Sequence, residues 1–381
     1  MTRTEGGESR LQTSKSPVPE SYGIEKCENN LIRELKMKDQ SIKGTKSKDT
    51  SSGIGRREFL AGAGVATGAA ALLPSKVALS QGKFPNKPVQ LVVPFGTGGG
   101  SDRTLRMFAP YLAKELGVPV NVINISGGGG WVAWAQMAKW DPNKDDHIIG
   151  SVNLPHVLSY LDPQKKRSET LKSFNFLAWQ SLDPCIWAVR EGDERFQTLK
   201  EFIAYVQKNP GKVIMSTTAV GSDDHMGIAF AEKNIPGFKV GKVYANNDGK
   251  KIAEVVGNHT DAVAGNVGYY IPYMLERKLR PICVLSKDRS PNLPSVPTFE
   301  EVTGKLNISF AGRTLVVAPG LDAEKSKIYS EAIKRAISNP EYVMKEIKNK
   351  NPLHYITGDE MWKALRESEE FVKGVKYWEA G

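Results

Sequence analysis

Short apolar runs rich in β-branched residues alternate with amphipathic segments from Phe84 onward, and this alternation limits the possible folds more than any other feature. Val89–Pro94, for example, is followed by a glycine-rich turn and by an amphipathic segment at Asp102–Leu116. The pattern is typical of an α/β protein whose strands, connected by helices, form largely parallel sheets. A chain of 381 residues is long enough to build two such lobes once its ends are removed.

The same periodicity places the other elements of the chain. Further strands are expected at Val120–Ile123, Ile148–Gly150, Ile186–Val189, Val213–Thr217, Asp261–Ala264, Pro281–Leu285 and Thr314–Ala318. Further helices are expected at Thr198–Asn209, from Asp223 onward, and at Ile252–Val256, Val267–Arg277, Ala323–Ile337 and Asp359–Lys376. The proline-rich stretch Ser290–Pro297 is expected to be a loop.

The N-terminal part of the chain has a different composition. Residues 1–55 are rich in charged and small polar residues with few aromatic ones, which predicts a disordered leader. Arg56-Arg57 precedes a short Ala/Gly-rich apolar run, so residues 56–80 are interpreted as a twin-arginine export signal peptide. Small residues suit cleavage after Ser80, and no cysteine follows for lipid attachment. We therefore expect a free periplasmic protein.

Two start codons are compatible with this leader. Translation from Met1 gives an unusually long leader, whereas translation from Met37 gives a signal of typical length, and Met37 is the start that we favour. N-terminal sequencing of the unprocessed precursor would decide between them.

The charge of the chain favours an anionic ligand over a nucleic acid. The net charge is +10, but the basic residues are spread along the chain. The sequence contains no arginine-rich arm, no zinc spacing and no alternation of aromatic and basic residues, so no nucleic-acid partner is expected. A basic surface would help to attract an anion.

Two of the three cysteines remain after export. Cys27 would be removed with the leader, which leaves Cys185 and Cys283. They could form one intramolecular disulfide, or they could be two half-buried free thiols in neighbouring strands. The sequence leaves both open, and we favour free thiols because a disulfide requires a specific geometry.

Three loops have the same design, in which a strand ends, small residues turn the chain, and a helix begins. They are Gly96–Asp102, Ser126–Trp131 and Thr217–His225. Small residues allow the main chain to approach a ligand, and the first amides of a helix have no acceptor within the helix. Such turns are suited to binding a carboxylate or a phosphate.

Other kinds of site do not fit the spacing of the residues. Gly96–Ser101 lacks the final glycine or alanine of a dinucleotide fingerprint, and no P-loop lysine follows. The five histidines are scattered, which argues against a metal site. Ser222, Asp224 and His225 are too close in sequence to act as a catalytic triad. We expect no cofactor, no metal and no enzymatic activity.

At these loops the chain resembles the substrate-binding proteins of tripartite tricarboxylate transporters, also called Bug-type receptors, and the likeness runs from about Phe84 to the C-terminus. The residues that carry it are Phe84–Val89, Val92–Phe95, Gly98-Gly99, Asp102, Asn124 with the glycines after it, Trp134, Asp145–Gly150, Asp224-His225, Gly257–Asp261, Lys278–Pro281, Arg289–Pro291 and Val296–Thr298.

The resemblance implies an α/β, two-lobe periplasmic binding protein of type II, which closes like a flytrap and has two crossover strands at its hinge. By analogy, residues 84–185 plus 284–381 would form lobe 1 and residues 186–283 would form lobe 2. Both remaining cysteines would then lie at the hinge, which makes their pairing worth testing.

The resemblance also implies which residues bind the carboxylate. Lobe 1 would supply Gly98, Gly99, Gly100, Ser101, Gly129 and Gly130. Lobe 2 would supply Thr217, Thr218, Gly221, Ser222 and His225. Trp131, which differs from the family pattern, could stack on a flat ligand or fill the lobe. Asp102 is expected to cap its helix.

A second departure concerns the family's glycine-rich turn in lobe 2, which reads Ala245–Gly249 here, with Asn247 and Asp248 within it. For this reason the identity of the ligand is not carried over from the family.

These features predict a receptor, expected to be monomeric, that delivers a di- or tricarboxylate or a similar organic acid to a membrane permease. A ligand-binding module that serves a sensor kinase or signalling receptor fits the same residues. Co-purification or genetic linkage with a permease would separate the two functions.

Overall fold

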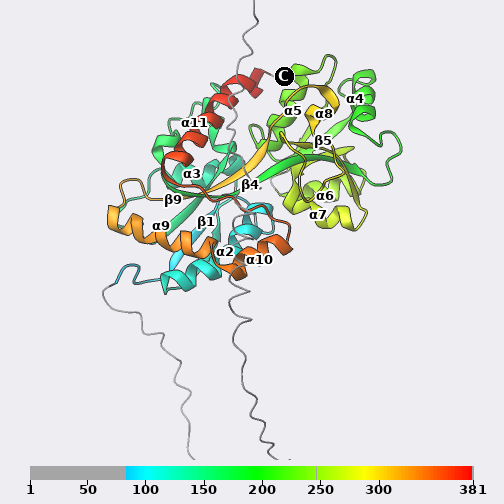
Figure 1. The fold of residues 1–381 in the computed structure, drawn as a ribbon. Coiled ribbons are helices and arrows are strands. Elements are labelled where there is room, and N and C mark those ends of the chain that lie inside the picture. Colours follow the sequence, from blue (N-terminus) through cyan, green and yellow to red (C-terminus); the bar gives the residue numbers. More distant parts are fainter. Residues whose placement is uncertain (1–82, 246, 380–381) are drawn as a thin grey trace, which may run out of the picture.

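The computed structural model describes residues 83–245 and 247–379. The predictions for the leader, the signal peptide, Met37 and Cys27 concern residues outside this part of the chain. Within the described part, no helix is both long enough and apolar enough to cross a membrane. The chain forms two α/β lobes that lie side by side (Figure 1).

The first lobe is built on a mixed sheet with the strand order β2-β1-β3-β9-β4. Its strands are β1 (Val89–Val93), β2 (Val120–Asn124), β3 (Ile148–Leu154), β9 (Phe310–Val317) and the first part of β4 (Asn175–Arg190). β1 is parallel to β2 and β3, whereas β9 is antiparallel to β3 and β4. The expectation of largely parallel sheets therefore holds for the outer strands and is wrong for those nearest the other lobe.

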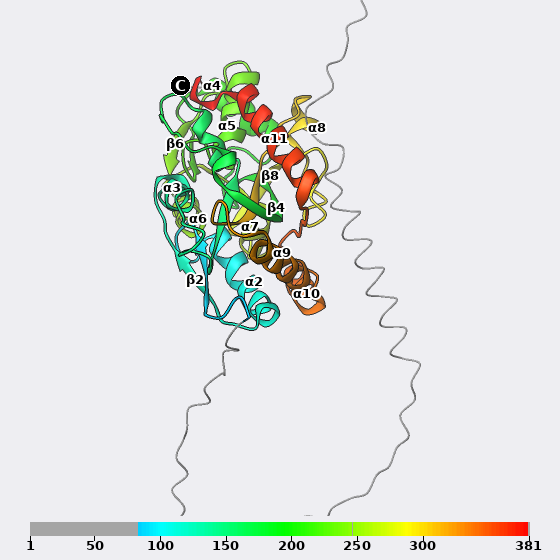
Figure 2. The same ribbon diagram turned by 90° about the vertical axis from the view of Figure 1, so that its left-hand side faces the viewer.

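Helices cover both faces of this sheet (Figures 1 and 2). One face is covered by α2 (Gly100–Leu116), α9 (Ala323–Ile337) and α10 (Pro340–Lys348), which share one hydrophobic cluster with the strands. The other face is covered by α3 (Trp131–Met137) and α11 (Gly358–Val375). Both faces of the sheet are therefore buried, and the strands can be apolar on both sides.

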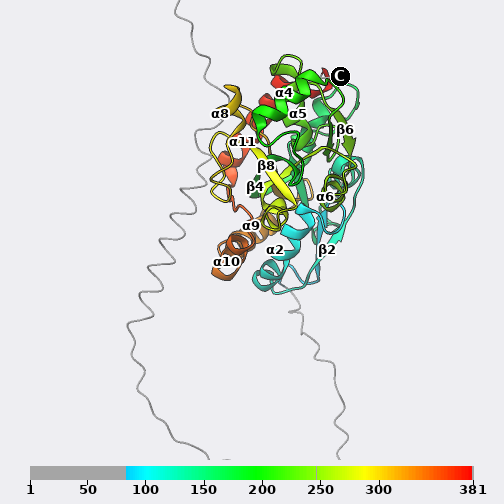
Figure 3. The same cartoon turned by 90° about the vertical axis from the view of Figure 1, so that its right-hand side faces the viewer.

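The second lobe contains the rest of β4 and four further strands: β5 (Ile214–Thr217), β6 (Gly241–Tyr244), β7 (Ala262–Asn266) and β8 (Leu279–Leu285). Its strand order is β4-β7-β5-β6, and β8 pairs with the other edge of β4. The helices are α4 (Leu199–Lys208), α5 (Asp223–Asn234), α6 (Asp248–Val256), α7 (Val267–Leu275) and α8 (Phe299–Thr303). Figure 3 shows this lobe from its own side. A hydrophobic cluster lies on each face of its sheet.

β4 belongs to both sheets. Its first part, through Pro184, pairs with β9, and its second part, from Cys185, pairs with β7 and β8. The sequence predicted only Ile186–Val189, because the first part of β4 carries polar residues that are nevertheless buried. One continuous strand therefore connects the two lobes.

The chain returns to lobe 1 after α8. Phe299 packs against Trp187 in a core cluster of the second lobe, and Val296 belongs to the other cluster of that lobe. Ser309 then bridges β8 and β4, since its amide donates to Leu285 O and its carbonyl accepts from the Cys185 amide. This packing favours a return near Ser309, later than the boundary between residues 283 and 284 that the resemblance implied.

Candidate functional site

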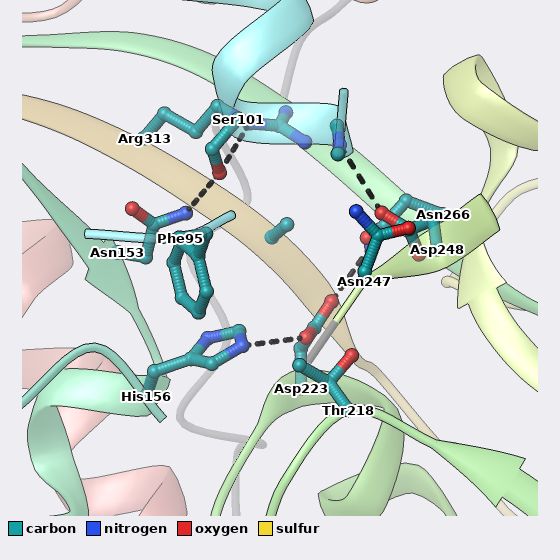
Figure 4. A pocket seen from close by; sticks show the side chains of 13 residues that line it. Phe95, Ser101, Asn153, His156, Thr218, Asp223, Asn247, Asp248, Asn266 and Arg313 are labelled. Carbon is teal, nitrogen blue, oxygen red and sulfur yellow. Dashed lines mark hydrogen bonds and ion pairs between the residues drawn. The ribbon is translucent and has the colours of Figure 1, made fainter. Parts of the chain in front are cut away.

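A pocket lies between the two lobes, and residues from both lobes form its walls (Figure 4). It encloses about 400 Å³ of space, part of which is open to solvent. The residues that line it are Phe95, Gly99, Gly100, Ser101, Asn153, His156, Thr218, Asp223, Asn247, Asp248, Asn266, Ala311 and Arg313. They lie at or just after the ends of β1, β3, β5 and β7, within β9, and at the starts of α2, α5 and α6, so strand ends from both sheets converge here.

The first predicted loop forms part of this pocket. Gly98 turns the chain with a positive φ of 81°, and Gly99 is the N-cap of α2. Gly99, Gly100 and Ser101 all line the pocket, whereas Gly98 is not among the lining residues. The N-terminal end of α2 therefore faces the space between the lobes.

Asp102 has a different role from the one that we expected. It lies within the first turn of α2 rather than at the N-cap, and its Oδ2 accepts a hydrogen bond of 2.8 Å from the Gly98 amide. Burial acts to raise the pKa of Asp102, but hydrogen bonds from Arg106 and Gly98 outweigh this effect and lower it. The carboxylate thus stabilises the loop before the helix.

Arg313, in the middle of β9, is the cation that the sequence analysis missed. It is only 4% exposed, and its Nε lies 3.4 Å from Ser101 Oγ, to which it donates. Its Nη1 donates to Ser181 Oγ at 3.3 Å. Ser101 Oγ also accepts a hydrogen bond of 2.9 Å from Asn153 Nδ2. One wall of the pocket therefore presents a guanidinium, a hydroxyl and an amide close together.

Asp183 lies behind Arg313, with its Oδ2 3.9 Å from Arg313 Nη1. Complete burial raises the pKa of this carboxyl from 3.8 to about 6, although Arg313 and the hydrogen bond from the Gly268 amide oppose the rise. The folded protein therefore holds this proton more tightly than the unfolded chain does. As a result, the contribution of Asp183 to stability falls as the pH rises from about 4 to 6.

This pKa leads to a testable pH dependence of binding. Below about pH 6 Asp183 is neutral and the charge of Arg313 is unopposed, whereas above it the carboxylate competes with an anionic ligand. We expect the affinity for a carboxylate to fall between pH 5 and pH 7, measured by calorimetry with an acid that stays ionised over this range. Asp183→Asn should flatten the profile, and an unchanged slope in that variant would contradict the assignment.

The opposite wall contributes two carboxylates. Asp223, at the start of α5, accepts a hydrogen bond of 2.7 Å from Asn266 Nδ2, and its Oδ1 lies 3.3 Å from His156 Nε2. Asp248, at the start of α6, accepts a hydrogen bond of 3.2 Å from the Gly100 amide of the other lobe. The two lobes are therefore in direct polar contact across the pocket (Figure 4).

A buried lysine supports this wall from behind. Lys251 is 1% exposed and lies 2.8 Å from Asp224 and 3.0 Å from Asp248. It also donates to Thr218 Oγ1 and to Ala264 O. Burial acts to lower the pKa of Lys251, but the two carboxylates outweigh this effect and raise it, so the side chain stays charged. Lys251 thus connects the loop that contains Thr218 with the start of α6.

The second predicted loop touches the other lobe without lining the pocket. A Cβ on Gly129 would lie 3.2 Å from the side chain of Ala219, so the glycine allows the two loops to meet. A Cβ on Gly130 would lie 2.5 Å from Trp134, so that glycine is required by packing within its own lobe. Gly129 and Gly130, whose main-chain amides were predicted to bind the ligand, are not among the residues that line the pocket.

Trp131 packs within lobe 1 and is not among the residues that line the pocket. It is 7% exposed, its Nε1 donates to Ser159 Oγ at 2.7 Å, and the guanidinium of Arg167 lies over its ring at 4.1 Å. Of the two interpretations that the sequence left open, the structure supports the packing role.

In the third predicted loop Thr218 and Asp223 line the pocket, and of these two only Thr218 was predicted to bind the ligand. Thr217 is a fully buried strand end. Ser222 is the N-cap of α5, where its Oγ accepts from the His225 amide and donates to Ala219 O. The Gly221 amide donates to Nδ1 of His225, whose pKa burial lowers to about 4. These four residues shape the loop and are not among the residues that line the pocket.

Among the residues that the structure describes, no three His, Cys, Asp or Glu side chains gather so that they could hold a metal ion. Cys185 and Cys283 are both buried and free, and Cys185 donates to Asp223 Oδ2 at 3.0 Å. The alternative of two free thiols is therefore the one that the structure supports.

Two α/β lobes joined by a shared strand, with a polar pocket between them, define the class of two-lobe solute-binding proteins. A family model described as the tripartite tricarboxylate transporter family receptor matches residues 104–366, more than half of the chain. The protein belongs to this family. It is a solute-binding receptor and not an enzyme.

Individual relatives agree with this assignment. The UPF0065 protein in the gbd 5' region of Cupriavidus necator is 31% identical over 295 residues, which cover 75% of this chain and 86% of the relative. MatC of Rhodopseudomonas palustris, solved with bound malate, has a TM-score of 0.67 at 20% identity and covers 78% of this chain and 99% of its own. The periplasmic binding protein BugD has a TM-score of 0.67 at 20% identity, with coverage of 77% and 99%. At these identities the two structures show the shared fold.

Proposed function

We propose that the protein is a periplasmic receptor that captures a small organic carboxylate between its lobes and delivers it to the membrane permease of a tripartite tricarboxylate-type transporter. The observation that carries this proposal is the buried Arg313 beside Ser101, at the N-terminal end of α2. The malate bound to MatC, which has the same fold, supports a carboxylate ligand.

The physical argument rests on the cost of burying charge. A guanidinium that is 4% exposed is stabilised by acceptors, and its present partners are two serine hydroxyls and the more distant Asp183. A ligand carboxylate can accept two parallel hydrogen bonds from a guanidinium, which is the strongest common pairing for this group. The partial positive charge at the start of α2 adds a smaller attraction, because its Gly100 amide already donates to Asp248.

Closure of the lobes would complete the site. Residues from both lobes line the pocket, so a bound ligand would contact both lobes in this arrangement and would lose contacts if the lobes moved apart. We infer that ligand binding favours the closed arrangement through these added contacts. The return of the chain near Ser309, beside β4, gives the two connections that such a hinge requires. We propose the lobe division at these two connections.

A thermal-shift screen against organic acids tests the function directly. A ligand that binds only the folded protein stabilises it by about 2.7 kcal/mol at a concentration one hundred times its dissociation constant. At least one small carboxylic acid is therefore expected to raise the melting temperature at neutral pH, with calorimetry confirming a single binding site. A screen in which amines, sugars or peptides stabilise the protein and carboxylates do not would contradict the proposal.

Export through the twin-arginine route is the second part of the proposal, and Arg56-Arg57 ahead of the apolar run supports it. Changing Arg56→Lys together with Arg57→Lys is expected to leave the precursor in the cytoplasm, as measured by fractionation and immunoblotting. The paired change Lys46→Arg and Lys48→Arg, outside the motif, should leave export intact. Normal periplasmic amounts of the twin-lysine variant would show that another route is used.

A further inference from the structure

The two walls of the pocket present opposite chemistry (Figure 4). On the lobe 1 side lie the guanidinium of Arg313 and the hydroxyl of Ser101. On the lobe 2 side lie the carboxylates of Asp223 and Asp248. A molecule that spans the pocket would meet donors at one end and anionic acceptors at the other.

The charges around the pocket do not favour a second carboxylate on the ligand. Arg313 is the one cation among the described residues that line the pocket, and Asp223 and Asp248 are its two acidic groups. The cation behind the lobe 2 wall, Lys251, is shared between Asp248 and Asp224, at 3.0 and 2.8 Å. A dicarboxylate would therefore place its second negative charge against the two acidic side chains, in a site where low solvent exposure strengthens repulsion.

The turn at the start of α6 provides an independent observation. The side chains of Asn247 and Asp248 in this turn reach across to lobe 1. Asn247 Nδ2 donates to Thr97 O at 3.2 Å, and Asp248 Oδ2 accepts from the Gly100 amide. In this chain a carboxylate of lobe 2 therefore occupies the first turn of α2, a position that a ligand anion would otherwise use.

The guanidinium of Arg313 and the carboxylate of Asp248 both lie close to Gly100, at the edge of the pocket. A Cβ built on Gly100 would be 3.1 Å from Arg313 Nη2 and 3.3 Å from Asp248 Oδ2. The two groups are not paired with each other at that spot. A small molecule with charges of both signs would match both of them, whereas a purely anionic molecule would match only Arg313.

We propose that the ligand is a zwitterion, a small organic acid that also carries a protonated amine. Its carboxylate would pair with Arg313 and Ser101, and its ammonium group would donate to Asp248 and Asp223. The inference rests on the proposed function, because it assumes a carboxylate ligand in this pocket. It adds that the other end of the ligand carries a positive charge. Asp248 Oδ2 accepts one hydrogen bond in the structure, from Gly100, and a carboxylate oxygen can accept another.

Matched ligands on the unmodified mature protein provide the main test. One set is 4-aminobutanoate, glutarate and pentanoate, and a shorter set is 3-aminopropanoate, succinate and butanoate. Within each set the molecules share a carboxylate and a spacer and differ in whether the far end is an ammonium, a carboxylate or a methyl group. Calorimetry at pH 7 is expected to show that the amino acid of at least one set binds at least about tenfold more tightly than its two partners.

The outcomes separate this inference from the function on which it depends. Tighter or equal binding of the dicarboxylates or of the neutral-tailed acids would overturn the zwitterion and leave the carboxylate receptor in place. Absence of binding by every acid in both sets and by every organic acid in the thermal-shift screen would overturn the carboxylate function as well.

Asp248→Asn tests the assignment of the ammonium end. Removing this charge is expected to lower the preference for the amino acid over the dicarboxylate of the same spacer by at least about tenfold. Because Asp248 also contacts Lys251, the ratio of two affinities measured on the same variant is the readout, and thermal unfolding checks that the variant is folded. Asp288→Asn, an exposed change on the same lobe, should leave the ratio unchanged. An unchanged ratio in a folded Asp248→Asn protein would overturn the assignment.

Discussion

Replacing Arg313 with glutamine is expected to weaken carboxylate binding by about 2–5 kcal/mol, or roughly 30-fold to several-thousand-fold. The side chain is 4% exposed and lies beside Ser101, so its loss would leave a bound carboxylate without its principal partner in a site with little water. Glutamine keeps some hydrogen-bonding capacity but lacks the positive charge. It also lacks the planar guanidinium, which can donate two parallel hydrogen bonds to a carboxylate. Isothermal titration calorimetry with the acid found by the thermal-shift screen would measure the effect.

Two further variants make this result specific. Arg313→Lys keeps the charge and loses the two-point geometry, so its affinity should fall between those of the glutamine variant and the unmodified protein. Arg366→Gln, on the exposed surface of α11, removes the same kind of charge elsewhere and should bind normally. If the Arg313→Gln protein is folded and binds with unchanged affinity, the carboxylate is held somewhere else.

Replacing Lys251 with alanine is expected to destabilise the protein by about 3–5 kcal/mol. Lys251 is 1% exposed and lies between Asp224 and Asp248, so its removal would leave two carboxylates close together without their shared cation. The pKa of Asp224, held at about 2 against the effect of burial largely by Lys251, should rise at the same time. Denaturant unfolding followed by circular dichroism would measure the loss.

The neighbouring residue provides a matched control. Lys250 lies next to Lys251 on the same helix but is exposed, so Lys250→Ala should change the free energy of unfolding by less than about 0.5 kcal/mol. Comparable losses in the two variants would mean that the effect comes from the helix and not from the buried charges.

Local sequence patterns predicted the helices and strands whose defining features, such as a periodic apolar face, lie within their own residues. The helical pattern at Ala323–Ile337 predicted α9 with the bounds that the structure has, because a periodic apolar face is a property of neighbouring residues. The length of β4 could not be found in this way. Gln180 and Asp183 resemble loop residues in the sequence, yet Gln180 is buried against Tyr342 and Asp183 accepts a hydrogen bond from the Gly268 amide. Those partners come from distant parts of the chain.

The candidate site was predicted in part for the same reason. The loop at Gly99–Ser101 was found because glycine before a helix is a local signal, and it does line the pocket. Ser222 lies in a loop of the same strand–turn–helix design, but its hydroxyl caps its own helix. Arg313 was missed, although an arginine in the middle of the otherwise apolar run Phe310–Val317 was a visible sign of a buried charge. Its partner Ser101 lies 212 positions away, so only the fold brings them together.

The sharing of β4 between the two sheets has a consequence for unfolding. Loss of pairing in one lobe would free the adjoining end of the strand on which the other sheet is built, because the residues through Pro184 pair with β9 and those from Cys185 pair with β7 and β8. The lobes should therefore melt together in a single calorimetric transition. The amide protons in the middle of β4 should be among the slowest in the molecule to exchange with deuterated water.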